Sequence, residues 1–241
     1  MARRERVSST RRAFATTSRA TTASSRPSPL RELPFAELPF DEAATESWLA
    51  LQCADIQSDA LRSAVLERLS ALAMDYTPRV SIEEPDAVVL EVRGSFRLFG
   101  GARALCQQIA ARAQAASIPI DWALAPTPLS ALALARAKKP VLVSSRERLV
   151  GLLAPLPIGV LRWPPSQLQR LESIGVRTLG ALLRLPRAGF ARRFGQPALQ
   201  MLDRLTGAAA DLRRPHRVCE RFRCRREPDF DFAVGSLAPN G

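Results

Sequence analysis

The chain has 241 residues, 46% of them hydrophobic, and a formal net charge of +12. A chain of this length can bury a core, and we expect two small folded parts rather than one. The absence of any run of about 18 apolar residues excludes a membrane-spanning helix. Lys and Arg outnumber Asp and Glu by 35 to 23. This excess favours a polyanionic partner, nucleic acid before a membrane.

The four cysteines are too few and too scattered for a disulfide framework, which favours the reducing cytoplasm. His216, Cys219 and Cys224 could supply three metal ligands, but their spacing matches no common zinc module. We therefore predict no cofactor and no metal site.

The chain begins with a segment that we expect to be disordered. Residues 1–31 contain eight Arg, one Glu and eleven Ser or Thr, so they cannot bury enough surface to offset the entropy of ordering. An organellar transit peptide has a similar composition. We favour a non-native start, in which upstream coding sequence is lost, because no first strand follows.

Apolar periodicity predicts the next elements in chain order. After a possible cap at Ser58, four residues recur every three or four positions and predict a core-facing helix: Leu61, Val65, Leu69 and Leu72. A run rich in Val and Leu predicts a buried strand from Ala87 to Gly94. Gly100-Gly101 then begins a helix to about Ala116. A strand (Ile118 to Leu124), a helix (Pro126 to Ala137) and a strand (Pro140 to Val143) follow, as in a ferredoxin-like α+β fold.

The second half of the chain is basic. Residues 157–207 carry eight Arg against Glu172 and Asp203. A turn at Gly175 can expose amides to a phosphate, and arginine adds a bidentate grip. We therefore predict DNA-backbone contacts by Gly175, Arg177, Thr178, Arg192 and Arg193.

Alternation from Val218 to Arg225 predicts a strand with one charged face. Arg223 and Arg225 would project from it about 7 Å apart, near one inter-phosphate step. With Arg221 they are predicted to contact DNA. The alternative is a frayed, solvated end.

The stretch from Tyr76 to Gly101 resembles, without a gap, the second palm motif of the Y-family translesion DNA polymerases. On this register the family's catalytic Ser-Ile-Asp-Glu falls on residues 84–87, where only Asp86 keeps a carboxylate. We interpret the nearby Ser81-Ile82-Glu83-Glu84 as coincidence, because it lies three residues too early. Asp86 is thus predicted to be a remnant of the metal-binding motif, with no catalytic role.

The family begins with an apolar strand that carries another metal-binding Asp. No such strand is found between Met1 and Phe40, where prolines break the apolar runs. Asp86 alone cannot hold two magnesium ions, which need several oxygen ligands. We therefore predict a palm without its first strand, in a chain truncated at both ends.

Two further stretches resemble the same family. Residues 125–140 match Ala-Pro-Asn-Lys-x-x-Ala-Lys-x-Ala-x-Asp-x-x-Lys-Pro. Lys139 keeps the lysine that touches nucleotide phosphates, unless it is simply a solvated helix end. Pro128, Leu132 and Arg136 replace other polar positions. Residues 156–207 resemble the family's small helical thumb, with its signature at residues 171–195.

The first thumb hairpin departs from the family. It is Arg162-Trp163-Pro164-Pro165 in place of Pro-Gly-x-Gly. Proline has no amide hydrogen to offer, so we expect no phosphate grip there and a packing role for Trp163.

The resemblance implies an α+β fold with three parts. They are a partial ferredoxin-like palm (a mixed sheet with helices), a small all-α thumb with helix-hairpin-helix-like turns, and the start of a little-finger sheet. The expected divisions are a tail (1–31), palm and fingers (32–155), thumb (156–210) and a linker with a truncated little finger (211–241).

Among Y-family proteins the departures most resemble the ImuB type, catalytically inactive homologues in bacterial mutagenesis cassettes. That resemblance implies a non-catalytic adaptor of translesion synthesis. It would bind primer-template backbone in the nucleoid and meet a sliding clamp and an error-prone replicative-type polymerase. Two alternatives stay open. One is an active polymerase whose first carboxylate is Glu37, Asp41 or Glu42, and the other is a non-functional fragment.

Overall fold

The computed structural model describes residue 40, residues 46–53 and residues 58–213. These residues all belong to one compact unit of the chain. The predicted disordered tail and the predicted strand Val218 to Arg225, with Arg221 and Arg223, lie outside the described residues. None of the described helices is long and apolar enough to cross a membrane.

A four-stranded antiparallel sheet in the order β2-β3-β1-β4 forms the centre of the fold. Its strands are β1 (Trp48–Cys53), β2 (Val80–Glu83), β3 (Ala87–Glu91) and β4 (Ile120–Ala125). The prediction that the first strand is missing is therefore wrong, because β1 lies between β3 and β4. All six residues of β1 are buried. A strand that is covered on both faces is a continuous apolar run without the alternation of a half-exposed strand.

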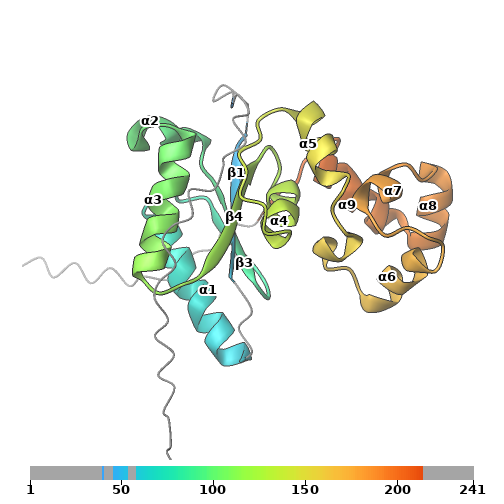
Figure 1. Cartoon of the computed structure of the whole chain (residues 1–241), viewed down its shortest axis with the longest axis horizontal. Helices are drawn as coiled ribbons and strands as arrows, with labels where there is room; N and C mark the ends of the chain where they lie inside the picture. Colours follow the sequence, from blue (N-terminus) through green and yellow to red (C-terminus); the bar gives the residue numbers. More distant parts are fainter. Residues whose placement is uncertain (1–39, 41–45, 54–57, 214–241) are drawn as a thin grey trace, which may run out of the picture. The chain divides into compact units, whose positions relative to one another are not determined.

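Helices cover both faces of the sheet (Figure 1). One face carries α1 (Asp59–Met74), the short α2 (Phe96–Phe99) and α3 (Ala102–Ala115), and the other carries α4 (Pro128–Arg136). Leu49, Leu51 and Leu90 pack into the first layer, whereas Ala50 and Ala123 pack against α4. The fold is thus α+β, as predicted.

The helix predicted after Ser58 exists, but its buried face differs in part. Leu66, Leu69 and Ala73 are buried, whereas Leu61 is 63% exposed. Ser58 occupies the N-cap position without a capping hydrogen bond from its side chain. Ser58 is therefore the N-cap residue, as predicted. Val65, Leu69 and Leu72 pack on the core, and only the predicted contact of Leu61 is wrong.

The region after β3 largely follows the predicted order. β3 ends at Glu91, and a 3-10 turn, η1 (Arg93–Ser95), follows it. Gly100 and Gly101 adopt φ angles of 81° and 100° before α3 begins, a conformation that favours glycine. In place of the strand predicted over Pro140 to Val143, one parallel bridge joins Leu142 to Leu124 of β4.

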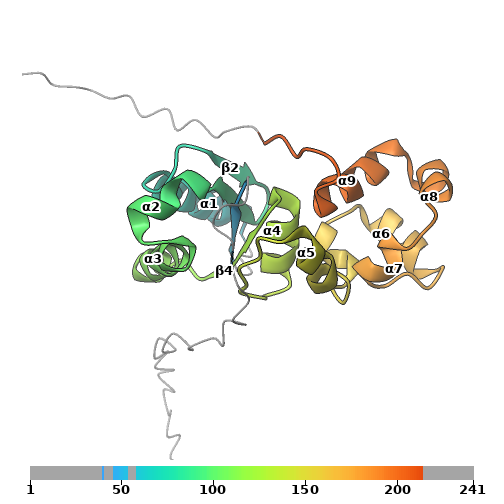
Figure 2. The same cartoon turned by 90° about the horizontal axis from the view of Figure 1, so that it is seen from above.

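Short helices make up the rest of the described chain: α5 (Arg146–Leu153), η2 (Ile158–Leu161), α6 (Pro165–Glu172), α7 (Leu179–Leu183), α8 (Arg187–Phe194) and α9 (Gln196–Thr206). We call residues 156–207 the helical segment. Its buried side chains, such as Leu171 and Leu202, continue the core beneath α4. Figure 2 shows α6 to α9 grouped together beyond α4. The divisions at residues 155 and 210 stay predictions.

Candidate nucleic-acid interface and the Asp86 cluster

Asp86 lies where the turn between β2 and β3 meets the end of β1. Its backbone N–H donates to the Glu83 carbonyl (3.3 Å), and its own carbonyl accepts from Cys53 of β1 (2.8 Å). Only 10% of the Asp86 side chain is exposed. The carboxylate is thus fixed where the β2–β3 turn meets β1.

Three side chains bind the Asp86 carboxylate. Arg136 Nη2 donates to Oδ1 (3.0 Å) and Arg162 Nη2 to Oδ2 (2.6 Å). Gln52 Nε2 also donates to Oδ2 (3.3 Å). We call these four residues the Asp86 cluster. A buried carboxylate needs compensating charge and hydrogen bonds, and two guanidinium groups provide them here.

Arg136 is the last residue of α4, and only 9% of its side chain is exposed. Its Nη1 also donates to the Val160 carbonyl (3.3 Å), so one guanidinium joins α4, the β2–β3 turn and η2. The family motif has an Asp at this position. Arg136 therefore reverses the charge at this position. A positive side chain there can form an ion pair with Asp86.

Arg162 follows η2 with a left-handed backbone (φ 55°), which costs a non-glycine residue roughly 1 kcal/mol. Its ion pair with Asp86 offsets this cost. The two prolines after it open α6 at Pro164 and Pro165. Trp163 is 6% exposed and lies 6.2 Å from the Phe190 ring, which confirms its packing role.

Two other positions beside Asp86 carry no acid. Gln52 of β1 pairs with Ala87 of β3 across the sheet. Gln52 is the only polar residue of β1, and its side chain is an amide. Sequence reasoning missed Gln52 because it missed β1. The signal available was a single Gln at the end of the run WLALQC.

The residues around Asp86 do not fit the two-metal site of the polymerase fold. Both carboxylate oxygens accept from guanidinium groups, and the adjacent side chains are an amide and a methyl group. Divalent magnesium prefers several oxygen ligands. Within the described part of the chain, no group of three or more His, Cys, Asp or Glu residues could hold a metal ion.

Burial raises the pKa values of two side chains at this end of the sheet. Burial, with a smaller contribution from the Asp86 charge, raises the pKa of Cys53 to about 11. Burial also raises the pKa of Asp121, the partner of Gln52 on β4, and nearby Lys138 partly offsets this. Lys139 is exposed beyond α4, and no side-chain contact to Asp86 is found for it in residues 58–213. Its nucleotide-binding role stays a prediction.

In the hairpin between α6 and α7, the Gly175 and Val176 amides donate to the Glu172 and Leu171 carbonyls (2.9 and 3.0 Å), so they are not exposed to a phosphate as the sequence predicts. Gly175 adopts a φ of 83°, and a Cβ there would meet no atom within 4 Å. Thr178 caps α7, because its hydroxyl accepts from the Ala181 amide (3.3 Å). The Arg177 side chain is exposed and has no partner in the described structure. The turn can therefore offer a guanidinium to a phosphate.

Arg192 and Arg193 lie in the last turn of α8, and both are exposed. Their side chains have no partner among residues 58–213. By contrast, Arg187 forms a bidentate pair with Asp203 (2.7 and 2.8 Å). Arg184 Nε donates to the Gly180 carbonyl (3.0 Å). The arginines of the helical segment thus divide into those that hold the fold and those that face solvent.

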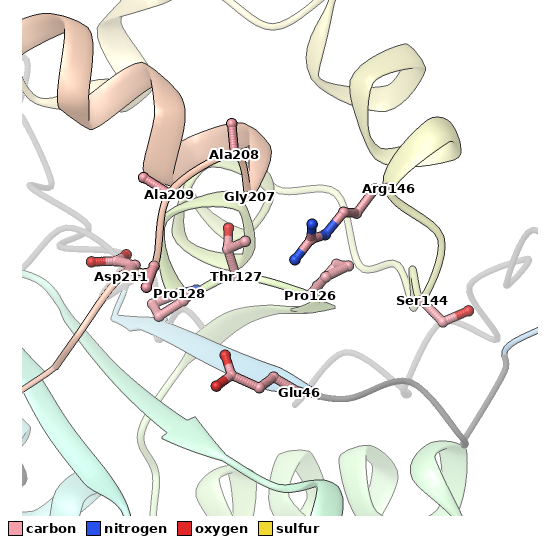
Figure 3. Close-up of a pocket in the computed structure, with 11 residues that line it drawn as sticks. Glu46, Pro126, Thr127, Pro128, Ser144, Arg146, Gly207, Ala208, Ala209 and Asp211 are labelled. Carbon is pink, nitrogen blue, oxygen red and sulfur yellow. The ribbon is translucent and has the colours of Figure 1, made fainter.

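A separate cavity of about 590 Å³ lies where α9 ends against the start of α4 (Figure 3). Arg146 points into it, with Glu46 and Asp211 on other walls. Gly207 has a φ of 78°, and a Cβ there would meet Arg146 Nε at 3.1 Å. Because the walls carry both signs of charge, this cavity does not favour a phosphate.

The chain is similar in sequence to Protein ImuB from two strains of one bacterium. No family model matches the chain. Protein ImuB from Caulobacter vibrioides strain NA1000 / CB15N is 32% identical over 155 residues, which are 63% of this chain and 34% of the relative. Protein ImuB of the strain ATCC 19089 / CIP 103742 / CB 15 gives the same values. The chain therefore spans about a third of the length of these relatives.

Solved structures share the fold. The crystal structure of DinB from Sulfolobus solfataricus gives a TM-score of 0.52 at 16% identity, covering 66% of this chain and 48% of that chain. A ternary complex of Dbh gives 0.52 at 17% identity, covering 66% of this chain and 49% of that chain.

Proposed function

We propose that this chain is a Y-family polymerase-like protein of the ImuB type and a non-catalytic DNA-binding adaptor of translesion synthesis. The 32% identity to Protein ImuB over 155 residues and the fold shared with DinB support this proposal. The chain would hold primer-template DNA by the backbone, without sequence preference, since phosphate contacts position a protein but do not specify a sequence. By the same resemblance it would act in the cytoplasm, on the nucleoid. Its partners there would be a sliding clamp and an error-prone replicative-type polymerase.

The proposal that the protein is not a catalyst rests on one observation: arginine side chains already bind the Asp86 carboxylate. Phosphoryl transfer in this fold needs metal ions held by several carboxylates. Here Arg136 and Arg162 take both oxygens of the remaining carboxylate. Gln52 and Ala87 stand beside it, and neither is a metal ligand of the kind that magnesium prefers. The competing candidates Glu37, Asp41 and Glu42 lie outside the described residues.

The DNA-binding part rests on the solvent-facing arginines of the helical segment. Arg177 on the Gly175 hairpin and the pair Arg192–Arg193 on α8 come from two separate turns. Each offers a guanidinium that the described fold does not use. Arginine binds phosphate oxygens in a bidentate manner. Two turns of this kind would fix a duplex backbone at two points.

The test is the affinity of the chain for primer-template duplex across a salt series. We expect log affinity to fall with log salt at a slope of about −0.9 per phosphate contact, for roughly four to six contacts. Arg192→Ala with Arg193→Ala should weaken binding equally on unrelated sequences and reduce the slope by about two contacts.

Two controls separate this surface from general charge. Arg97→Ala with Arg103→Ala removes the same charge from α2 and the start of α3, and it should change the slope by less than one contact. Deletion of residues 1–31 removes eight Arg and no described element. Loss of all binding on this deletion, or a weakening confined to one DNA sequence, would contradict the assignment.

A further inference from the structure

The short turn between β2 and β3 carries three carboxylates, and two of them, Glu83 and Asp86, pair with arginine. Glu83 ends β2, and Asp86 precedes β3. The hydrogen bond from the Asp86 N–H to the Glu83 carbonyl (3.3 Å) holds the backbone of the turn together. In the polymerase fold this turn serves metal binding, whereas here both acids bind arginine.

The two arginines lie on either side of α6 to α9 in the chain. Arg162 follows η2 just before α6 and pairs with Asp86 (2.6 Å). Arg213 lies after α9, beyond the helical segment, and pairs with Glu83 (2.6 Å). One turn of the sheet therefore holds the chain on both sides of α6 to α9.

Each of the two ion pairs has a further ionic partner. Asp86 has a second partner in Arg136 (3.0 Å), and Arg213 has a second partner in Asp211 (2.7 Å). Three arginines thus face three acids. The side chains of Arg136, Arg213 and Asp211 are 9%, 15% and 5% exposed. Partial burial weakens the screening that makes surface ion pairs nearly neutral.

A groove of about 600 Å³ separates this turn from the helices of the segment. Glu83 and Arg162 line one part of it, and Met201 and Arg204 of α9 line another. At the other end of α4, the Thr127 hydroxyl reaches the Leu205 carbonyl of α9 (3.3 Å). Apolar packing and this hydrogen bond therefore fix α9 at the start of α4. The ion pairs of Asp86 and Glu83 fix the chain near the other end of α4.

We propose that the turn Glu83–Asp86 is a two-point electrostatic clasp. Its carboxylates keep the helical segment closed on α4 by holding residues 162 and 213. When both pairs are broken, the segment swings about its contact with α4 and the groove opens. With either pair intact the segment stays closed, because the remaining pair acts at a high effective concentration. This device does not depend on the proposed DNA binding.

The test is hydrogen exchange of the full chain at η2 and at residues 208–213. Arg162→Gln leaves Asp86 paired with Arg136, and Glu83→Gln leaves Arg213 paired with Asp211. Neither variant leaves a buried charge alone, so both should fold. We expect each single variant to speed exchange less than about twofold and the double variant about tenfold or more, because each pair is a charged hydrogen bond.

Salt provides the second readout. Raising the ionic strength should speed exchange at η2 in the native chain and leave the double variant unchanged. Arg187→Ala, which breaks the exposed pair with Asp203 inside the segment, should keep the native response to salt. Either of two results would overturn the clasp: a double variant no faster than the native chain, or single effects that multiply to give the double.

Discussion

The carboxylate of Asp86 is stabilised by groups that differ in how far they are buried. The Arg136 side chain is 9% exposed and the Arg162 side chain is 49% exposed. A charge that loses its partner is costly when water cannot reach it. The two arginines should therefore differ in their contribution to stability, although both bind the same carboxylate.

We expect Asp86→Ala to lower the free energy of unfolding by about 3 kcal/mol, because it leaves Arg136 buried without its main partner. Arg162→Ala should cost about 1 kcal/mol or less, because water can replace a half-exposed partner. Urea unfolding measures both. Equal losses in the two variants would show that burial of Arg136 does not decide the cost.

Cys53 gives a pH-dependent prediction. Its pKa is raised from 9.0 to about 11 in the folded chain, first by burial and then by the Asp86 charge. The folded state keeps its proton while the unfolded state loses it above pH 9. This stability contribution is therefore full below pH 9 and falls as the pH rises toward 11.

Alkylation of Cys53, followed by peptide mass spectrometry over a pH series, checks this. We expect almost no labelling of the native chain at pH 8 and ready labelling in urea. Cys106, whose pKa burial raises to about 12, is the internal control. Rapid native labelling of Cys53 at pH 8 would contradict the burial.

At the residue scale, the sequence locates Asp86 but not its environment. The family register identifies Asp86 from adjacent residues. Its partners Arg136 and Arg162 lie 50 and 76 positions away, and only folding brings them together. The left-handed backbone of Arg162 has no sequence signal, because that conformation favours glycine.

At the scale of elements, α7 packs unusually close to the end of α5. The Gly180 N–H donates to the Ala154 carbonyl (2.9 Å), and a Cβ on Gly180 would lie 2.9 Å from that oxygen. Backbone atoms cannot move aside as a flexible side chain can. Glycine is therefore required here by contact with a neighbouring element rather than by its φ angle.

We expect Gly180→Ala to destabilise the chain by about 1 to 3 kcal/mol, the usual cost of overpacking. Gly189→Ala, in the middle of α8, is the matched control. A Cβ there would meet nothing within 4 Å, so the substitution should be neutral or stabilise by up to about 1 kcal/mol. Thermal unfolding compares the two, and a neutral Gly180→Ala would exclude the close approach.

The elements that the sequence predicts best are those with local signals. The glycines before α3 and the apolar run of β3 give clear boundaries. β1 gives none, because burial on both faces removes the alternation of a strand and Gln52 replaces the expected acid. The strand predicted over Pro140 to Val143 is reduced to one bridge between Leu142 and Leu124.

At the scale of the whole molecule, the chain shares the fold of solved DinB and Dbh structures, and two arginines bind the Asp86 carboxylate near its centre. Composition and motifs predict the α+β class, the basic helical segment and the family. They do not predict that the β2–β3 turn contacts residues on both sides of α6 to α9. This arrangement depends on ion pairs between residues far apart in sequence, which no local pattern encodes.

The most direct test of the account is primer extension by the full chain with primer-template DNA, all four deoxynucleotides, and magnesium or manganese. We expect no extension with either metal, and the same DNA affinity with metal or with a chelator, because guanidinium groups already hold the Asp86 carboxylate. Metal-dependent extension that Asp86→Asn abolishes would contradict the account and assign the chain to the active polymerases.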